Sequence, residues 1–301
     1  MVISLLNQKM IAEYIELNPN INKVGSVYDN IMVRSPLRFP GSKFQAIKFI
    51  KPIWESVEHD EFREPFFGGG AVFFAKPKVK HNWVNDLSKD LVLTFKVMAD
   101  SEKRELLKKL ISDVEIPTKE KHTEIKEWKP NTKIDKAFRY YYLNRTSYSG
   151  IMKKPAWGFH PTKSVHPHKW GDRIEIAGLK LQDTDITNLD FSEVINAPAK
   201  GNSVLMFVDP PYYKADQKRA YEHSFIEEEH TRLANELKNT EHKFILTYDD
   251  CPEVRELYSW ANIYAVSWRY HTANSNKAKR KMGQELIITN FKLDSATLKK
   301  I

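Results

Sequence analysis

The feature that most constrains the fold is a glycine cluster that joins an apolar segment to a helix-like one. Residues 62–66 are typical of a buried strand and run directly into the glycines at 68–70. Small and aromatic residues at 71–75 predict a helix, and residues 81–84 predict a second strand that ends near Asp86. This order of strand, glycine turn, helix and strand begins a doubly wound α/β sheet.

Four further segments have the residue pattern that is typical of β-strands. They span residues 203–208, 243–248, 263–268 and 285–291. The last two flank a polar loop at 271–283, which predicts a hairpin that closes the sheet.

The chain divides into four regions that differ in residue composition and pattern. We expect an N-terminal extension at 1–34, opening with an amphipathic helix, and a catalytic domain formed by 35–99 together with 176–301. Residues 100–175 begin with a run rich in lysine and glutamate and turn aromatic and basic, which indicates an inserted, partly irregular domain. A length of 301 residues suits one large domain with such an insertion.

Composition narrows the choice of partners. The net charge of +8 permits a polyanionic partner such as nucleic acid, although charge alone is weak evidence. No apolar run approaches the ~20 residues that span a bilayer. The single cysteine, Cys251, excludes an intramolecular disulfide and a multi-cysteine zinc site, which favours a reducing compartment such as the cytoplasm. His160, His166 and His168 have no acidic or cysteine partner at ligand spacing, so we expect no metal.

The glycine turn is a candidate ligand site. Glycines between a strand and a helix let the backbone approach a ligand that faces the helix N-terminus. Asp86 follows Gly68 by 18 residues and stands where an acid can accept hydrogen bonds from ribose hydroxyls. The spacing does not match the dinucleotide pattern of the Rossmann fold. A turn selected only for tightness remains the alternative.

A second candidate is the run Asp209, Pro210, Pro211 and Tyr212, which follows the apolar strand. Ligands bind at the carboxyl ends of strands in open α/β sheets. The prolines fix the backbone and leave their carbonyls free to accept hydrogen bonds. An amine on a flat base can donate one hydrogen to Asp209 and another to the Pro210 carbonyl, while Tyr212 stacks on the ring. A strand-terminating turn is the alternative.

A third candidate is the turn at residues 38–43, before a helical pattern. Lys43 at its end can meet a ligand carboxylate or remain solvated.

Together these motifs resemble the Dam-type DNA adenine methyltransferases over residues 36–291, in the family's order. The resemblance implies a Rossmann-like methyltransferase sheet, mostly parallel with an antiparallel last strand, and an inserted target-recognition domain. It implies S-adenosyl-L-methionine as cofactor, with Asp190 near the cofactor adenine. The implied cofactor contacts are Phe39, Lys43, Pro65, Phe66, Gly68, Gly69, Gly70, Ala71, Asp86, Asp190 and Asp209.

Residues 143–151 resemble the family's target-recognition signature. The implied DNA contacts are Asn144, Arg145, Tyr148, Ser149, Lys153 and Lys154. Tyr148 matches an aromatic that wedges into the base stack, or it simply packs. Lys153 stands where GATC-specific members have a guanine-reading arginine, and Ser149 replaces an asparagine, so GATC specificity does not follow from the resemblance. Lys163 and the basic loop at 274–281 are further candidates for phosphate contact, with a solvated loop as the alternative for the second.

The resemblance implies an enzyme that methylates adenine N6 in a base flipped out of duplex DNA, encoded by a restriction–modification system or a phage. Asp209 and Pro210 would orient the amine for direct displacement, without a covalent enzyme intermediate. A cognate restriction endonuclease would act separately, and the chain would be a monomer or a weak dimer. Cytosine-N4 methylation remains an alternative, although those enzymes usually carry serine at the Asp209 position. A non-catalytic DNA-binding relative is a second alternative.

Overall fold

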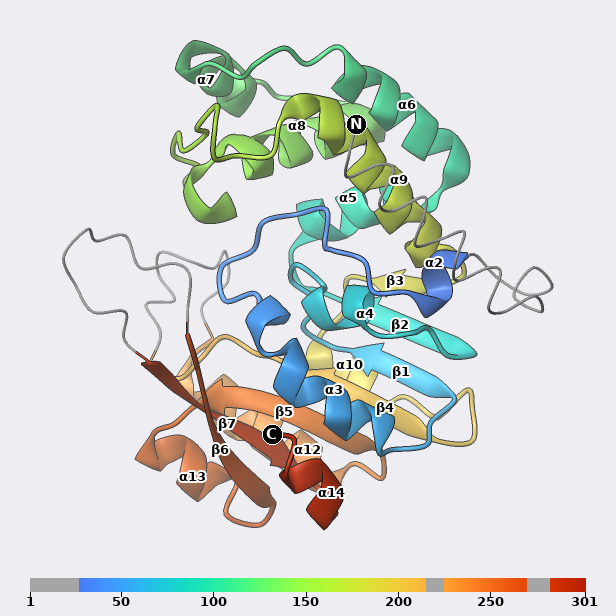
Figure 1. Cartoon of the computed structure of the whole chain (residues 1–301), viewed down its shortest axis with the longest axis vertical. Coiled ribbons are helices and arrows are strands. Elements are labelled where there is room, and N and C mark those ends of the chain that lie inside the picture. The colour runs from blue at the N-terminus through green and yellow to red at the C-terminus, as the bar shows by residue number, and fades with distance from the viewer. Residues whose placement is uncertain (1–26, 215–224, 270–281) are drawn as a thin grey trace.

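The computed structural model describes residues 27–214, 225–269 and 282–301 (Figure 1). The amphipathic helix expected at the start of the chain and the basic loop at 274–281 lie outside these residues.

The described strands form one seven-stranded sheet in the order β3-β2-β1-β4-β5-β7-β6 (Figure 1). Their bounds are β1 Glu61–Glu64, β2 His81–Asn85, β3 Asp185–Thr187, β4 Val204–Val208, β5 Lys243–Asp249, β6 Asn262–Arg269 and β7 Met282–Thr289. The pairs between β3, β2, β1, β4 and β5 are all parallel. Strand β7 runs antiparallel to both β5 and β6. The predicted Rossmann-like sheet and its closing hairpin are therefore confirmed.

Strand β4 shows why its sequence is continuously apolar. Leu205 and Phe207 pack into the hydrophobic core on one face of the sheet. Val204, Met206 and Val208 pack into a second core on the other face. A parallel strand covered by helices on both faces needs apolar residues at every position.

The helices divide between the two faces. Their bounds are α2 Val27–Asn30, α3 Ile47–Glu55, α4 Ala71–Ala75, α5 Lys89–Ala99, α6 Ser101–Ser112, α7 Lys119–Glu127, α8 Lys133–Thr146, α9 Trp170–Leu181, α10 Phe191–Asn196, α12 Glu227–Asn239, α13 Pro252–Leu257 and α14 Ser295–Leu298, with short 3-10 turns η2 Lys43–Gln45, η3 Tyr148–Gly150 and η4 Pro167–Lys169. Helices α3, α4 and α5 share one core, and α10, α12 and α13 share the other. Within the described part of the chain, no helix has the length and apolarity needed to cross a membrane.

Helices α6, α7, α8 and α9 gather beyond the β3 edge of the sheet, away from β6 (Figure 1). Residues 147–169 within this group are mostly irregular, with short turns only. Helix α9 runs across position 175, and α5 packs on α8 and α9. The assignment of 100–175 to an inserted domain stays a prediction.

Strand boundaries differ from the expected ones for local reasons. Strand β1 ends at Glu64 rather than residue 66, because Pro65 has no N–H to donate to a neighbouring strand. Strand β7 ends at Thr289 rather than residue 291. The side chain of Asn290 there accepts from the Phe244 N–H at 3.1 Å and donates to the His242 carbonyl at 2.9 Å, which closes the ladder. The short strand β3 was not expected from the sequence.

Candidate active site

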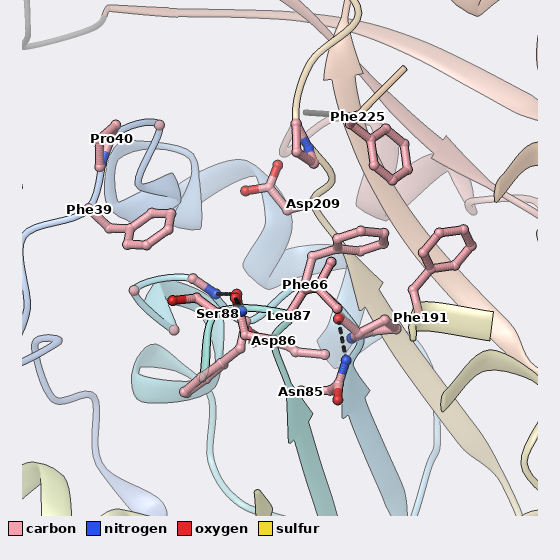
Figure 2. A pocket seen from close by; sticks show the side chains of 18 of the residues that line it. Phe39, Pro40, Phe66, Asn85, Asp86, Leu87, Ser88, Phe191, Asp209 and Phe225 are labelled. Carbon is pink, nitrogen blue, oxygen red and sulfur yellow. Dashed lines mark hydrogen bonds between the residues drawn. The ribbon is translucent and has the colours of Figure 1, made fainter. Parts of the chain in front are cut away.

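A cavity of about 540 Å³ opens at the carboxyl ends of the parallel strands (Figure 2). Its walls come from the segments after β1, β2, β3 and β4, and from the turn before α3. Every residue expected to hold the cofactor lines it: Phe39, Lys43, Pro65, Phe66, Gly68, Gly69, Gly70, Ala71, Asp86, Asp190 and Asp209. Five separate stretches of sequence therefore meet at one site.

The glycine turn is shaped by close packing against Phe39. A Cβ on Gly69 would lie 2.7 Å from the Phe39 Cβ, and one on Gly68 would lie 2.8 Å from the Phe39 ring. Gly68 and Gly70 also have positive φ angles of 48° and 67°, which favour glycine. The turn therefore needs glycines both for its backbone shape and for the cavity wall.

Asp86 ties the end of β2 to this turn. Its Oδ2 accepts a hydrogen bond from the Gly68 N–H at 2.8 Å, and its Oδ1 accepts from the Ser88 N–H at 2.9 Å (Figure 2). A carboxylate has about four lone-pair positions, so Asp86 can still accept from a ligand hydroxyl. The geometry suits the ribose contact that the sequence predicts.

Asp209 is held by two side chains at the centre of the site. The Lys43 Nζ lies 2.8 Å from each of its carboxylate oxygens, and the Thr247 hydroxyl donates to Oδ1 at 2.8 Å. The Lys43 side chain is only 5% exposed and also donates to the Gly41 carbonyl at 2.9 Å. The resulting ion pair is shielded from water and fixes the direction in which Asp209 points.

Tyr212 is anchored from behind by Glu285, a residue whose role the sequence did not indicate. The Tyr212 hydroxyl donates to Glu285 Oε2, and the Lys43 ammonium lies 4.6 Å from the Tyr212 ring centroid. Burial raises the pKa of Glu285 to about 7, although Lys43 and the Tyr212 hydroxyl oppose the shift. Burial likewise raises the pKa of Tyr212 well above its usual value. The signal in the sequence was an acid directly before the apolar run 286–288.

Asp249, at the end of β5, fixes the chain that follows Tyr212. Its Oδ1 accepts from the Tyr213 N–H at 2.9 Å and its Oδ2 accepts from the Lys214 N–H at 2.8 Å. These two hydrogen bonds fix the backbone directly after Tyr212, and so they help to orient its side chain from the adjacent strand. An acid directly after a predicted strand was the signal that could have indicated it.

Glu64, the last residue of β1, also lines the cavity. Its Oε1 is buried and has no hydrogen-bond partner among the described residues. Burial raises the pKa of this carboxyl well above its usual value. In the sequence, Glu64 stands at the start of the glycine motif, but no role was assigned to it.

Asp190 caps helix α10 and is paired with Arg232, which the sequence did not single out. The Arg232 guanidinium donates to Oδ1 at 2.7 Å and to Oδ2 at 2.8 Å, and lies 4.0 Å from the Phe191 ring centroid. The hydrogen bonds from Arg232 hold the pKa of Asp190 well below its usual range. In sequence, Arg232 is one polar residue of an amphipathic helix, so no pattern marks it.

Aromatic rings form the apolar side of the cavity. Phe66 stacks on Phe191 with centroids 5.3 Å apart and meets Phe225 edge-on at 5.6 Å. Figure 2 shows these rings gathered on one side, with Phe39 on the other and Asp209 near the cluster. A flat aromatic ligand fits such a surface.

Two of the expected DNA contacts need correction. Asn144 is fully buried: its Oδ1 accepts from the Arg38 N–H at 2.8 Å, and its Nδ2 donates to the carbonyls of Arg38 and Gly150 at 2.8 and 3.2 Å. Arg145 is 5% exposed, and burial lowers its pKa to about 10. Both side chains face inward, where a DNA phosphate does not reach them. Asn144 ties α8 to the segment that carries Phe39, a structural role.

The other expected DNA contacts lie nearer the surface. Tyr148 and Ser149 are half-buried, and Lys153 and Lys154 are exposed. Ser149 has a positive φ of 54°, a conformation that asparagine adopts more readily than serine. Lys153 lines the cavity together with the residues that we expect to hold the cofactor. DNA contact by these four residues stays a prediction.

The fold and the site together define the class of Rossmann-like methyltransferases that act on amino groups. The chain belongs to the family of D12 class N6 adenine-specific DNA methyltransferases, whose family model matches residues 39–272. It is an adenine-specific DNA methyltransferase.

Individual relatives agree with this assignment. The chain is 30% identical over 201 residues to a type II methyltransferase of Paramecium bursaria Chlorella virus NC1A, covering 65% of this chain and 76% of that protein. It is 24% identical to a type II methyltransferase of Lactococcus lactis subsp. cremoris, covering 87% and 97%. It is 25% identical to the DNA N-6-adenine-methyltransferase of Escherichia phage P1, covering 75% of this chain and 31% of that protein.

Proposed function

We propose that this chain binds S-adenosyl-L-methionine in the 540 Å³ cavity and methylates N6 of an adenine flipped out of duplex DNA. The single observation that carries the proposal is the position of Asp209. This carboxylate lies on the wall of the same cavity that gathers all the expected cofactor residues.

The residues of the cavity fit this cofactor. Asp86 suits the ribose hydroxyls, the Phe66 and Phe191 rings suit the adenine, and the Lys43 ammonium suits the carboxylate. The glycine turn leaves room for a ligand because side chains are absent there. When bound, the cofactor would supply an electrophilic methyl group on a sulfonium sulfur.

The chain's own residues then act on the target amine. Asp209 and the Pro210 carbonyl each accept one N6 hydrogen, which favours a pyramidal nitrogen whose lone pair points at the methyl group. Tyr212 stacks on the base and holds its plane. The new N–C bond would form as the bond between the methyl carbon and the sulfonium sulfur breaks, with its electron pair left on the sulfur. N6 then loses one proton, for which Asp209 is the proposed acceptor. The rate enhancement comes from orientation and fixed charge.

A flipped target has an energetic cost of a few kcal/mol in lost stacking and pairing. Tyr148, Ser149, Lys153 and Lys154 are the candidates to offset it, because they are accessible and close to the cavity. We further propose a type II modification role with a separate endonuclease partner, since two relatives are named type II methyltransferases.

The test of the site assignment is Asp209→Ala. We expect methylation of duplex DNA to fall about a hundredfold to a thousandfold, because the orienting acceptor is lost. Binding of duplex DNA should persist. Asp113→Ala, an exposed acid far from the cavity, is the matched control and should keep full activity. Full activity in Asp209→Ala would exclude the proposed mechanism.

A further inference from the structure

A second, smaller hollow of about 260 Å³ adjoins the candidate active site. The two share Tyr140, Met152 and Lys153 as lining residues, so they are separated by little more than these side chains. We call this second cavity the basic hollow.

Four cationic side chains surround the basic hollow. Lys126 comes from α7, Arg139 from α8, and Lys153 and Lys154 from the loop after η3, against one carboxylate, Asp90. Within the part of the chain that the structure describes, none of the four cations forms an ion pair with an acidic side chain. Their charge is therefore available to an anion from outside.

Arg139 is held in place by the end of α7. Its Nε donates to the Ile125 carbonyl at 3.1 Å and its Nη2 donates to the Lys126 carbonyl at 2.6 Å. These bonds leave Nη1 for a further acceptor. A guanidinium that is already fixed loses little conformational entropy when an anion binds.

We propose that the basic hollow binds a phosphodiester group of the target strand, next to the nucleotide whose base enters the active site. The inference rests on the proposed methylation of a flipped adenine. A flipped base and the phosphate beside it are covalently linked, so they need adjoining sites. The shared wall of Tyr140, Met152 and Lys153 supplies that arrangement. Phosphate contacts of this kind fix the register of a protein on DNA.

The test combines a protein variant with neutral backbone linkages. Lys126→Gln/Lys154→Gln removes two charges from the hollow, and Lys119→Gln, an exposed lysine of the same helix outside it, is the control. The double variant should lower the slope of log K against log salt by about 1 to 2, with the control unchanged. A single methylphosphonate placed at each linkage around the target adenine should then weaken wild-type binding at one flanking position. That same substitution should have no further effect in the double variant.

Two results would overturn the proposal. One is a salt slope that is the same in the double variant as in the wild type. The other is that the double variant and every methylphosphonate weaken DNA binding independently of each other. The proposed function is judged separately, by the cofactor affinity and the turnover of the wild-type protein. If the wild type itself transfers no methyl group to adenine, the proposed function fails instead of the hollow alone.

A second observation concerns the place that Lys43 occupies. Its ammonium donates toward Asp209 at 2.8 Å and lies 4.6 Å from the Tyr212 ring centroid. A target amine would use this same carboxylate and lie at this same ring. We infer that Lys43 occupies the position of the target amine until a cofactor carboxylate draws it away, so that the base enters only after the cofactor. This inference also rests on the proposed function.

Fluorescence of 2-aminopurine at the target position measures entry of the base, because the probe brightens when it unstacks. With wild-type protein we expect brightening only when S-adenosylhomocysteine, which carries the same carboxylate, is present. Lys43→Met, which keeps the length but removes the charge, should brighten the probe without it. Equal brightening of the wild type with and without S-adenosylhomocysteine would overturn the inference, whatever the variant does. The fluorescence measurement involves no methyl transfer, so a failed transfer reaction remains a separate result.

Discussion

The Asp86 carboxylate accepts a hydrogen bond from the Gly68 N–H at 2.8 Å, across 18 residues of sequence. This contact joins the end of β2 to the glycine turn after β1. It places an acid and a side-chain-free backbone on the same wall of the cavity. The relationship explains how two motifs that are separate in sequence form one candidate cofactor site.

Removal of this acid should weaken cofactor binding. Asp86→Ala loses both the support of the turn and the acceptors for a ribose, so we expect the Kd for S-adenosyl-L-methionine to rise about 10- to 100-fold. Isothermal titration calorimetry measures the change. Asp113→Ala should leave the Kd as it is, and an unaltered Kd in Asp86→Ala would exclude the ribose contact.

Gly69→Ala should destabilise the protein and damage the cavity. The added Cβ would lie 2.7 Å from the Phe39 Cβ, so Phe39 or the turn must shift, at a cost of about 1 to 3 kcal/mol. Gly171→Ala is the matched control, because a Cβ there meets nothing within 4 Å and alanine favours the helix. Denaturant unfolding compares the two. Equal stability in both variants would contradict the packing described for Phe39.

Stability should depend on pH through Glu285. Burial raises the pKa of this carboxyl to about 7, above the usual 4.5 of a glutamate, so the folded state binds a proton more tightly than the unfolded state. The free energy of unfolding should therefore fall as pH rises from about 4.5 to about 7, by roughly 1 to 3 kcal/mol from this group. The charged and titratable neighbours are Lys43, Asp209, Asp249 and Tyr212.

Chemical unfolding across this pH range, with Glu285→Gln as the comparison, isolates the contribution. The variant keeps an acceptor for the Tyr212 hydroxyl but cannot ionise, so its curve should be flatter than that of the wild type. Parallel curves would mean that Glu285 does not titrate in this window.

Asn144→Ala separates a structural role from DNA contact. The variant leaves the Arg38 N–H and carbonyl without their buried partner, so the free energy of unfolding should fall by about 2 to 4 kcal/mol. The Kd for duplex DNA should stay unchanged below the unfolding temperature. A higher Kd without a loss of stability would restore Asn144 as a DNA contact.

The sequence was sufficient for the parts of the site that lie within one motif. The apolar run before Asp209 and the glycines before α4 each place a candidate ligand-binding residue at the end of a strand. Both patterns can be recognised in the local sequence, without knowing which distant residues lie nearby. The last strand was also predictable, because a polar loop separates it from the strand-like segment before it, and this arrangement indicates a hairpin.

Residues that act across elements were not predictable in this way. Glu285 meets Tyr212, and Arg232 meets Asp190, only because the strand order brings them together. Asn144 looked like a surface residue of a recognition motif, yet the packing of α8 on the Phe39 segment buries it. Burial of a polar side chain depends on tertiary packing, which a local pattern does not contain.

The most direct test of the central claim is the chemical identity of the methylated base. Purified protein is incubated with S-adenosyl-L-methionine labelled on its methyl group and with unmethylated duplex DNA of mixed sequence. The product is then digested to nucleosides and separated by chromatography with mass detection. We expect the label in N6-methyladenine, and we expect it to be lost with Asp209→Ala. Label in N4-methylcytosine, or bound cofactor without any transfer to DNA, would contradict methylation of adenine N6 by this chain.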